Sequence, residues 1–108
     1  AKLMRGDQEG ALLDFNSAIE LDENFVSAYS NRGALKSDLG NYEGALIDLN
    51  KAIEIDPNNV RAYQNRAITH DRDGNIPDSC KDLKKGSSLG NESATRILEN
   101  AKTRGLCK

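Results

Sequence analysis

The sequence predicts an all-α repeat protein, a single domain over residues 1–108 built from stacked pairs of helices. Two observations predict it: residues recur with a period of 34, as at Gly6, Gly40 and Gly74, and apolar residues within each period follow helical spacing. A period of this length is typical of a two-helix unit that is repeated by stacking. Stacked units build extended binding surfaces, so the period also bears on function.

Residues 1–25 are predicted to form a partial first repeat. Only residues 1–5 are available for its first helix, and no initiator Met is present, so we expect a fragment or processed form of roughly two and a half repeats. The apolar stripe of Leu12, Phe15 and Ile19 would then be less covered than its later copies. We therefore expect that self-association through this stripe can produce a homo-oligomer.

Residues 26–59 are predicted to form the second repeat. Its first helix, over 26–39, ends before Gly40, which can adopt the left-handed backbone conformation that ends a helix. Its second helix, over 43–55, has apolar residues at spacings of three and four, the pattern of an amphipathic helix. Pro57 then ends the unit, because proline disfavours helical geometry in the residue before it.

Residues 60–93 repeat this plan as the third repeat, and residues 91–104 are predicted to form a C-terminal capping helix. Asn91 is a suitable N-cap for that helix. Its polar residues would supply the solvated outer face that a terminal repeat needs.

The repeated residues resemble the tetratricopeptide repeat, whose pattern combines aromatic, Gly, Ala and Pro positions. The second repeat carries this pattern at Tyr29, Gly33, Ala45, Leu49 and Pro57. The resemblance covers about residues 1–93. It implies a right-handed α–α superhelix of about two and a half helix-turn-helix units, followed by the capping helix.

Two positions depart from the family pattern. Arg32 and Arg66 replace the usual Leu, and we expect their aliphatic stems to be packed and their guanidinium groups to be paired with a carboxylate of a neighbouring repeat. Lys36 and His70 replace the usual Tyr, and His70 is interpreted as a partly buried helix residue.

The resemblance also implies where a ligand binds. In this family the first helices line the concave side, so their unpacked residues would face a groove. The expected groove residues are Ser27, Ser30, Asn31, Ala34, Asp38, Arg61, Gln64, Asn65, Ile68 and Arg72. Small and amide side chains suit an extended peptide, because an amide both donates and accepts hydrogen bonds. For Asn31 and Asn65, hydrogen bonding between neighbouring helices is the alternative role.

The predicted function is therefore a non-catalytic protein–protein interaction module, a scaffold or adaptor that binds a peptide or a partner helix in its concave groove. The alternative is a structural module that self-assembles through exposed repeat ends. Only Asn31 and Arg61 match the dicarboxylate clamp of chaperone-binding members, so a full clamp for a carboxylate terminus is not expected.

Composition excludes several other classes. There is one histidine, the cysteines lie far apart and no phosphate-binding Gly-rich loop is present, so no enzyme, metal site or cofactor is predicted. Asp14, Asp48 and Asp82 recur with the period and indicate a repeated structural environment. The net charge of −2 argues against nucleic acid as a partner. The apolar runs are too short for membrane insertion.

Cys80 and Cys107 leave two interpretations open. Cys80 takes the place of Leu12 and Leu46, which favours a small buried apolar side chain. A capping helix that runs back along the helix of Cys80 would also allow a disulfide with Cys107. Localisation stays unknown: the cytoplasm is favoured, and the periplasm or secretion would follow from a bonded pair.

Overall fold

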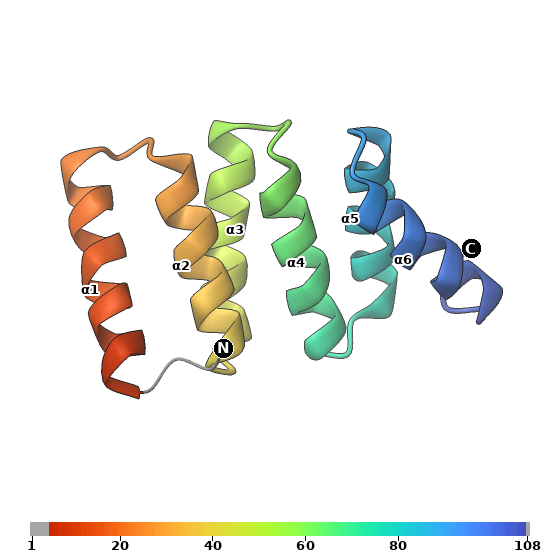
Figure 1. Cartoon of the computed structure of the whole chain (residues 1–108), viewed down its shortest axis with the longest axis horizontal. Coiled ribbons are helices and arrows are strands. Elements are labelled where there is room, and N and C mark those ends of the chain that lie inside the picture. The colour runs from red at the N-terminus through yellow and green to blue at the C-terminus, as the bar shows by residue number, and fades with distance from the viewer. Residues whose placement is uncertain (1–4, 108) are drawn as a thin grey trace.

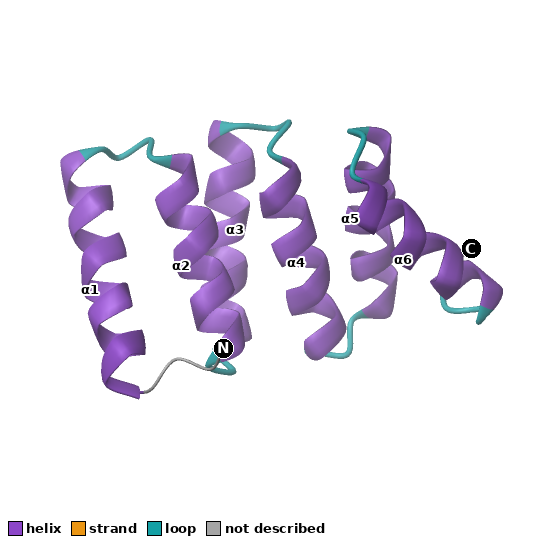
Figure 2. Ribbon diagram, in the orientation of Figure 1, coloured by secondary structure: helices purple, strands orange, loops and turns teal. Residues whose placement is uncertain are grey.

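The computed structural model describes residues 5–107, with side chains from Gln8 onward. This part of the chain forms six α-helices and no strand (Figures 1 and 2). The helices are α1 (Arg5–Leu21), α2 (Val26–Asp38), α3 (Tyr42–Ile55), α4 (Val60–Arg72), α5 (Ile76–Ser88) and α6 (Glu92–Thr103). The prediction of an all-α helical repeat is confirmed.

The helices are stacked in chain order along the long axis, with short turns alternating between the two ends (Figure 1). The body measures 42 × 28 × 22 Å. Helix α3 packs between α2 and α4, and α5 packs between α4 and α6, whereas the main contact of α1 is with α2. Helices α2 and α4 also contact each other directly. We call α2, α4 and α6, the first helices of successive pairs, the first layer, and α1, α3 and α5 the second layer (Figure 1).

Helix boundaries lie where the turn residues predict. Gly40 has a φ of +84°, and this left-handed turn lets the backbone N–H of Asn41 donate to the carbonyl of Lys36 over 2.8 Å. The side chain of Asn41 then accepts a hydrogen bond from the N–H of Gly44 and caps α3. Arg5 belongs to α1, although the sequence assigned it to an earlier helix; residues 1–4 lie outside the described part.

The tightest packing occurs between α2 and α3. Ala45, Leu49 and Ala52 on α3 are 0 % exposed. A Cβ atom on Gly33 of α2 would lie 2.8 Å from Cγ of Leu49 and 3.1 Å from the carbonyl oxygen of Ala45, closer than packed atoms tolerate. The two helices therefore approach each other closely at Gly33, where there is no room for a larger side chain.

Replacing Gly33 with alanine is expected to destabilise the protein by about 1–3 kcal/mol, because overpacking outweighs the gain in helix propensity. A Cβ atom on Gly10 of α1 would have no other atom within 4 Å, so Gly10→Ala should instead stabilise the protein by up to about 1 kcal/mol. Urea unfolding of the two variants measures both changes. A gain in stability at both positions would contradict this account of the α2–α3 contact.

Helix α6 packs through a different face from α2 and α4. Arg96 stands one period after Ala62, which is buried, and a long cation does not fit that slot. Arg96 is exposed, and Ala94 and Leu98 are buried with Leu83 of α5 instead. The helix runs at a slant to α5 in Figure 1. The predicted capping helix is present, but it is not a further copy of the first-layer helices.

Candidate functional site

Two arginines hold two buried carboxylates in matching clamps. Arg32 donates from Nε and Nη2 to the two carboxylate oxygens of Asp48, over 2.8 and 2.6 Å. Arg66 donates in the same way to Asp82, over 2.9 and 2.7 Å. Bidentate, charge-assisted bonds of this kind fix both distance and orientation. Each clamp therefore sets the geometry between the two helices of its own repeat.

Each arginine also reaches the preceding repeat. Nη1 of Arg32 donates to the side-chain oxygen of Asn16 over 2.8 Å, and Nη1 of Arg66 donates to that of Asn50 over 2.9 Å. The expectation of a carboxylate from a neighbouring repeat is wrong: the carboxylate belongs to the same repeat and the neighbour supplies an amide. Hydrogen bonding to Asp82 is the main cause that raises the pKa of Arg66, and Asp48 raises the pKa of Arg32 likewise.

The residue four positions after each arginine distinguishes the two clamps. Nζ of Lys36 lies 3.1 Å from Asp48, whereas Nε2 of His70 lies 3.8 Å from Asp82. The Nδ1 atom of His70 is buried without a hydrogen-bond partner. Asp82 therefore depends on Arg66 more than Asp48 depends on Arg32. His70 is partly buried in a helix, as the sequence indicated.

Polar contacts close the groove between α2 and α4. Nδ2 of Asn65 donates to Oγ of Ser30 over 3.2 Å. Nη1 of Arg72 donates to Oγ of Ser37 over 3.1 Å and to Oδ1 of Asp38 over 2.8 Å. Four of the expected groove residues thus join neighbouring helices in this structure, which is the alternative role that the sequence left open for Asn65.

The other expected groove residues are exposed or half-buried. Ser27, Arg61 and Ile68 are exposed, whereas Asn31, Ala34 and Gln64 are half-buried. Of all the expected groove residues, Gln64 and Ile68 are the two that line a pocket between α4, α5 and α6. This pocket lies at the C-terminal end of the stack and includes only these two of the expected groove residues.

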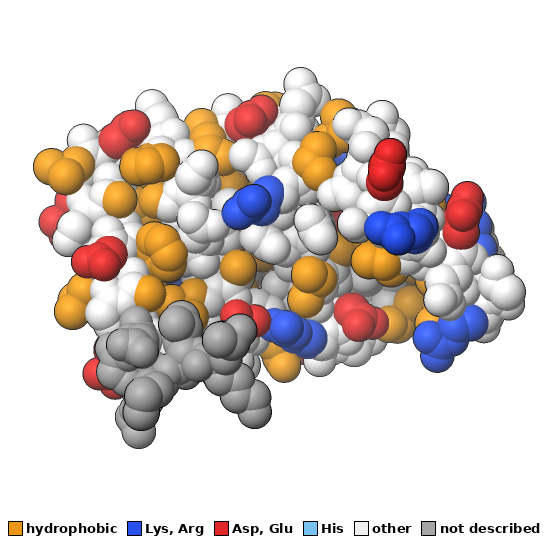
Figure 3. All heavy atoms as spheres, in the orientation of Figure 1, with side chains coloured by type: hydrophobic (Ala, Val, Ile, Leu, Met, Phe, Trp, Pro, Cys, Tyr) orange, Lys and Arg blue, Asp and Glu red, His pale blue; other side chains and the backbone are white. Residues whose placement is uncertain are grey.

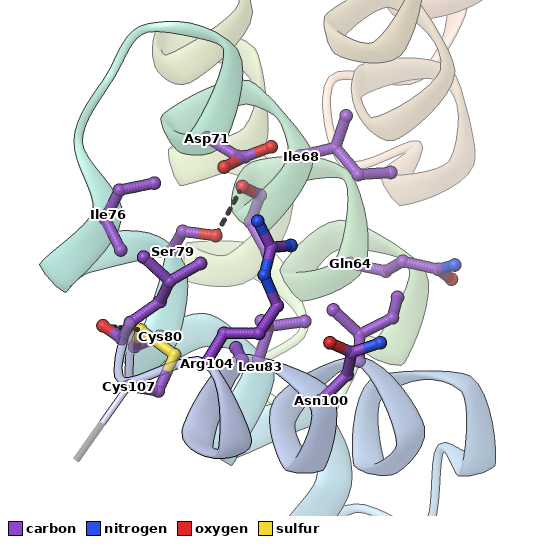
Figure 4. Close-up of a pocket in the computed structure, with 14 residues that line it drawn as sticks. Gln64, Ile68, Asp71, Ile76, Ser79, Cys80, Leu83, Asn100, Arg104 and Cys107 are labelled. Carbon is purple, nitrogen blue, oxygen red and sulfur yellow. Dashed lines mark hydrogen bonds between the residues drawn. A yellow bond between two sulfur atoms is a disulfide. The ribbon is translucent and has the colours of Figure 1, made fainter.

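This pocket has a volume of about 320 Å³ and a largely apolar wall. Ile68, Ile97 and Leu106 line it, although these side chains are 40 %, 47 % and 45 % exposed. In Figure 4, Arg104 lies between the Cys80–Cys107 disulfide on one side and Gln64 and Asn100 on the other. An apolar cavity edged by amide and guanidinium groups is suited to holding a side chain and orienting its backbone.

The pocket has two structural causes. The positions that join α2 to α4 through Asn65 and Arg72 are occupied one period later by Glu99 and Leu106, and no hydrogen bond joins α4 to α6 among the described residues. In addition, α6 packs on α5 through a different face from α2 and α4, so that Ile97 lies at the pocket together with residues of α4. The two first-layer helices consequently lie apart here.

A disulfide fixes the C-terminal end of the helix stack beside the pocket. Cys80 of α5 and Cys107, which follows α6, are joined with their Cα atoms 5.6 Å apart. Both side chains are buried, in a cluster with Leu83 and Leu98. The bond holds the last residues of the described chain against α5, so Leu106 and Arg104 stay at the edge of the pocket.

Sequence reasoning missed Ile97, Asn100, Arg104 and Leu106. It interpreted α6 as a capping helix with a polar outer face. It did not consider that Arg96 occupies a position that is alanine in the earlier repeats. The side chains of the first-layer face mix both charge signs, with hydrophobic groups over α1 and α2 at the left end (Figure 3). Among the side chains of residues 8–107 no three His, Cys, Asp or Glu groups are placed to hold a metal ion, and no described helix is long and apolar enough to span a membrane.

Stacked helical pairs with a hollowed first-layer face define a helical-repeat scaffold. Comparison with family models agrees: tetratricopeptide repeat models match residues 2–40, 26–59 and 49–81. The chain belongs to the tetratricopeptide repeat family. No curated protein matches its sequence.

Solved structures of tetratricopeptide domains are similar in fold. The TPR domain of Arabidopsis OM64 has 24 % identity and a TM-score of 0.81, covering 91 % of this chain and 83 % of that one. PcrH, in complex with the chaperone binding region of PopD, has 22 % identity and a TM-score of 0.84, covering 93 % and 82 %. The TPR2B domain of yeast Sti1, in complex with pHsp70, has 25 % identity and a TM-score of 0.82, covering 93 % and 86 %.

Proposed function

We propose that this protein is a non-catalytic interaction module, a scaffold or adaptor that binds an extended peptide of a partner protein along the face of α4 and α6. The observation that carries the proposal is the convergence of three partly exposed aliphatic side chains, Ile68, Ile97 and Leu106, on one pocket. Exposed aliphatic side chains around a concave site indicate an anchor for an apolar side chain.

The polar groups at the edge of the pocket suit a peptide backbone on either side of that anchor. Gln64 and Asn100 each present an amide, and Arg104 presents up to five N–H donors to carbonyl or carboxylate oxygens. Asp71 lines the same pocket, so both charge signs are available for orienting a ligand. Ser30 and Asn65, which already bond to each other, are then part of the scaffold that supports the groove.

Similar proteins support the class of function. PcrH is recorded in complex with the chaperone binding region of PopD, and the Sti1 domain in complex with pHsp70. Domains of this fold therefore hold segments of other proteins.

The experiment begins with a peptide selected from a random display library against the wild-type protein and labelled for fluorescence anisotropy. Ile97→Asp is expected to weaken its binding by about tenfold or more, because it places a charge in an apolar anchor site. Ile47→Asp is the matched control, since Ile47 is an exposed isoleucine of α3 outside this pocket.

Circular dichroism and thermal unfolding establish that both variants are folded. Equal binding by the wild type and Ile97→Asp would overturn the placement of the site at the pocket. A peptide whose binding instead falls with substitutions at Asn31 and Arg61 would place the site between α2 and α4.

Self-association through α1 is a second candidate function. Leu12, Phe15 and Ile19 are only half-buried, whereas Leu49, one period after Phe15, is fully buried. A complex between copies would cover this stripe. Sedimentation velocity over a wide concentration range, with Phe15→Asp as the disrupting variant, tests it: a monomer at every concentration would dismiss the candidate.

A further inference from the structure

Arg104 places an unpaired cation at the edge of the pocket. Three other arginines, Arg32, Arg66 and Arg72, each donate to a carboxylate over distances of 2.6 to 2.9 Å. Arg104 lines the pocket, and its side chain forms no hydrogen bond or ion pair with any residue that the structure describes. The donors of its guanidinium group are therefore available to a ligand.

The backbone that carries this cation is held on both sides. The N–H of Arg104 donates to the carbonyl of Asn100 over 3.0 Å and closes the end of α6. The N–H of Leu106 donates to the carbonyl of Ala101 over 2.8 Å, and the disulfide ties Cys107 to α5. The guanidinium group is thus presented from an ordered backbone, which lowers the conformational cost of binding a ligand.

Asp71 of α4 limits the charge of a ligand that fits here. It is exposed and lines the same pocket, and its carboxylate has no hydrogen-bond or ion-pair partner in the described part of the chain. In Figure 4 the side chain of Arg104 points from α6 towards α4, the helix of Asp71. A carboxylate of the ligand at Arg104 would be attracted, whereas a second one near Asp71 would be repelled. One carboxylate, with backbone N–H groups for Asp71, suits the pocket.

The helical spacing of α6 sets the distance between the apolar and the charged parts of the pocket. Ile97, Asn100 and Arg104 line it from successive turns. Arg104 follows Ile97 by seven positions, which corresponds to about 10 Å along a helix. An extended peptide advances about 3.3 Å per residue, so it covers that distance in about three residues.

We infer that the pocket selects a partner segment in which an acidic residue lies about three residues from an aliphatic anchor residue, and that Arg104 determines this specificity. The inference rests on the proposed function, because it assigns a ligand class to the same pocket. A guanidinium group binds a carboxylate through two parallel hydrogen bonds. Gln64, Asn100 and Asp71 can bind backbone groups of a continuing chain, which favours an acidic side chain over a chain terminus as the source of the carboxylate.

The first test is a parallel selection from one random peptide display library against the wild-type protein and against Arg104→Gln. Both proteins are expected to select peptides with an aliphatic residue, because Ile68, Ile97 and Leu106 are unchanged. Only the peptides selected by the wild type should be enriched in Asp or Glu about three residues from the aliphatic residue.

The second test measures the contact with a labelled peptide from the wild-type selection. Arg104→Gln should weaken its binding about tenfold, as should replacement of the acidic residue of the peptide by its amide. The two changes together should cause no further loss, because they remove one contact. Lys102→Gln is the matched control and should leave binding unchanged, since Lys102 is an exposed cation of α6 outside the pocket. High salt should weaken binding by the wild type but not by Arg104→Gln.

The outcomes separate this inference from the proposed function. An aliphatic residue without an acidic neighbour in the wild-type selection, or equal affinity of the wild type and Arg104→Gln, would overturn the inference and leave the proposed function intact. Loss of binding on amidation of the C-terminus of the peptide, and not on replacement of its acidic residue, would overturn the side-chain source of the carboxylate. Selected peptides that are all insensitive to Ile97→Asp would overturn the proposed function itself. Arg104 is exposed, so Gln at this position should not affect folding, which circular dichroism checks.

Discussion

Replacing Arg66 with methionine is expected to destabilise the protein by about 3 kcal/mol. The change leaves the carboxylate of Asp82, whose side chain is 5 % exposed, without the two hydrogen bonds that it accepts from Arg66. Removal of one partner from a buried ion pair typically costs about 3–5 kcal/mol. The lower end applies because the side chain of Arg66 is itself 23 % exposed and water screens part of the interaction.

Arg32→Met is the matched comparison and should be less destabilising. Nζ of Lys36 lies 3.1 Å from Asp48 and remains after the change, whereas Nε2 of His70 is 3.8 Å from Asp82. Urea unfolding of the two single variants measures the difference. Equal losses at the two positions would contradict the predicted difference between the clamps, and a loss below about 1 kcal/mol for Arg66→Met would show that its clamp contributes no more than an exposed ion pair.

The contribution of the Arg66 charge itself should not depend on pH near neutrality. Hydrogen bonding to Asp82 raises the pKa of Arg66 above its already high ordinary value. A raised pKa of a cation adds stability that is complete below the unfolded-state pKa and disappears only as the pH rises through the folded-state value. That pH window lies far above neutral pH. The contribution of the Arg66 charge to the free energy of unfolding should therefore be constant near neutral pH.

Loss of the disulfide is expected to cost about 2–4 kcal/mol, since it closes a loop between residues 27 positions apart. The variant combines Cys80→Ala with Cys107→Ser. It should also bind the selected peptide more weakly, because Leu106 and Arg104 are no longer held at the pocket. Thermal unfolding and anisotropy measure the two effects.

Reduction of the wild-type protein should reproduce the behaviour of that double variant. A thiol count under denaturing, non-reducing conditions gives the state of the pair directly. Two free thiols in protein that was never reduced, or an unfolding temperature insensitive to reductant, would contradict this account of the C-terminal end.

The helices could be predicted because local chemistry determines them. Gly40 ends α2 and Asn41 caps α3 through contacts within a few residues, so the sequence pattern suffices. The recurrence of Asp14, Asp48 and Asp82 predicted a repeated environment, which Asp48 and Asp82 share and the exposed Asp14 does not. It did not indicate that an arginine 16 residues earlier fills it, because that pairing depends on how two helices are packed.

The pocket could not be predicted for a similar reason. It depends on which face α6 packs against α5. That face differs from the one used by α2 and α4, because Arg96 stands at a position that is buried in the earlier repeats. Periodicity assigns each residue the environment of its copy one period earlier, so it fails where one substitution changes the packing face. Asn65 and Arg72 were expected to face a ligand in the groove, but in the structure they donate hydrogen bonds to side chains of α2.

Isoleucine-methyl NMR tests the central claim most directly, because isoleucines lie both at the pocket and far from it. On titration with the selected peptide, the methyl signals of Ile68, Ile76 and Ile97 should shift, and that of Ile47 on α3 should not. Shifts confined to Ile47 or to Ile19 of α1, with the pocket signals unmoved, would contradict a peptide-binding groove between α4 and α6.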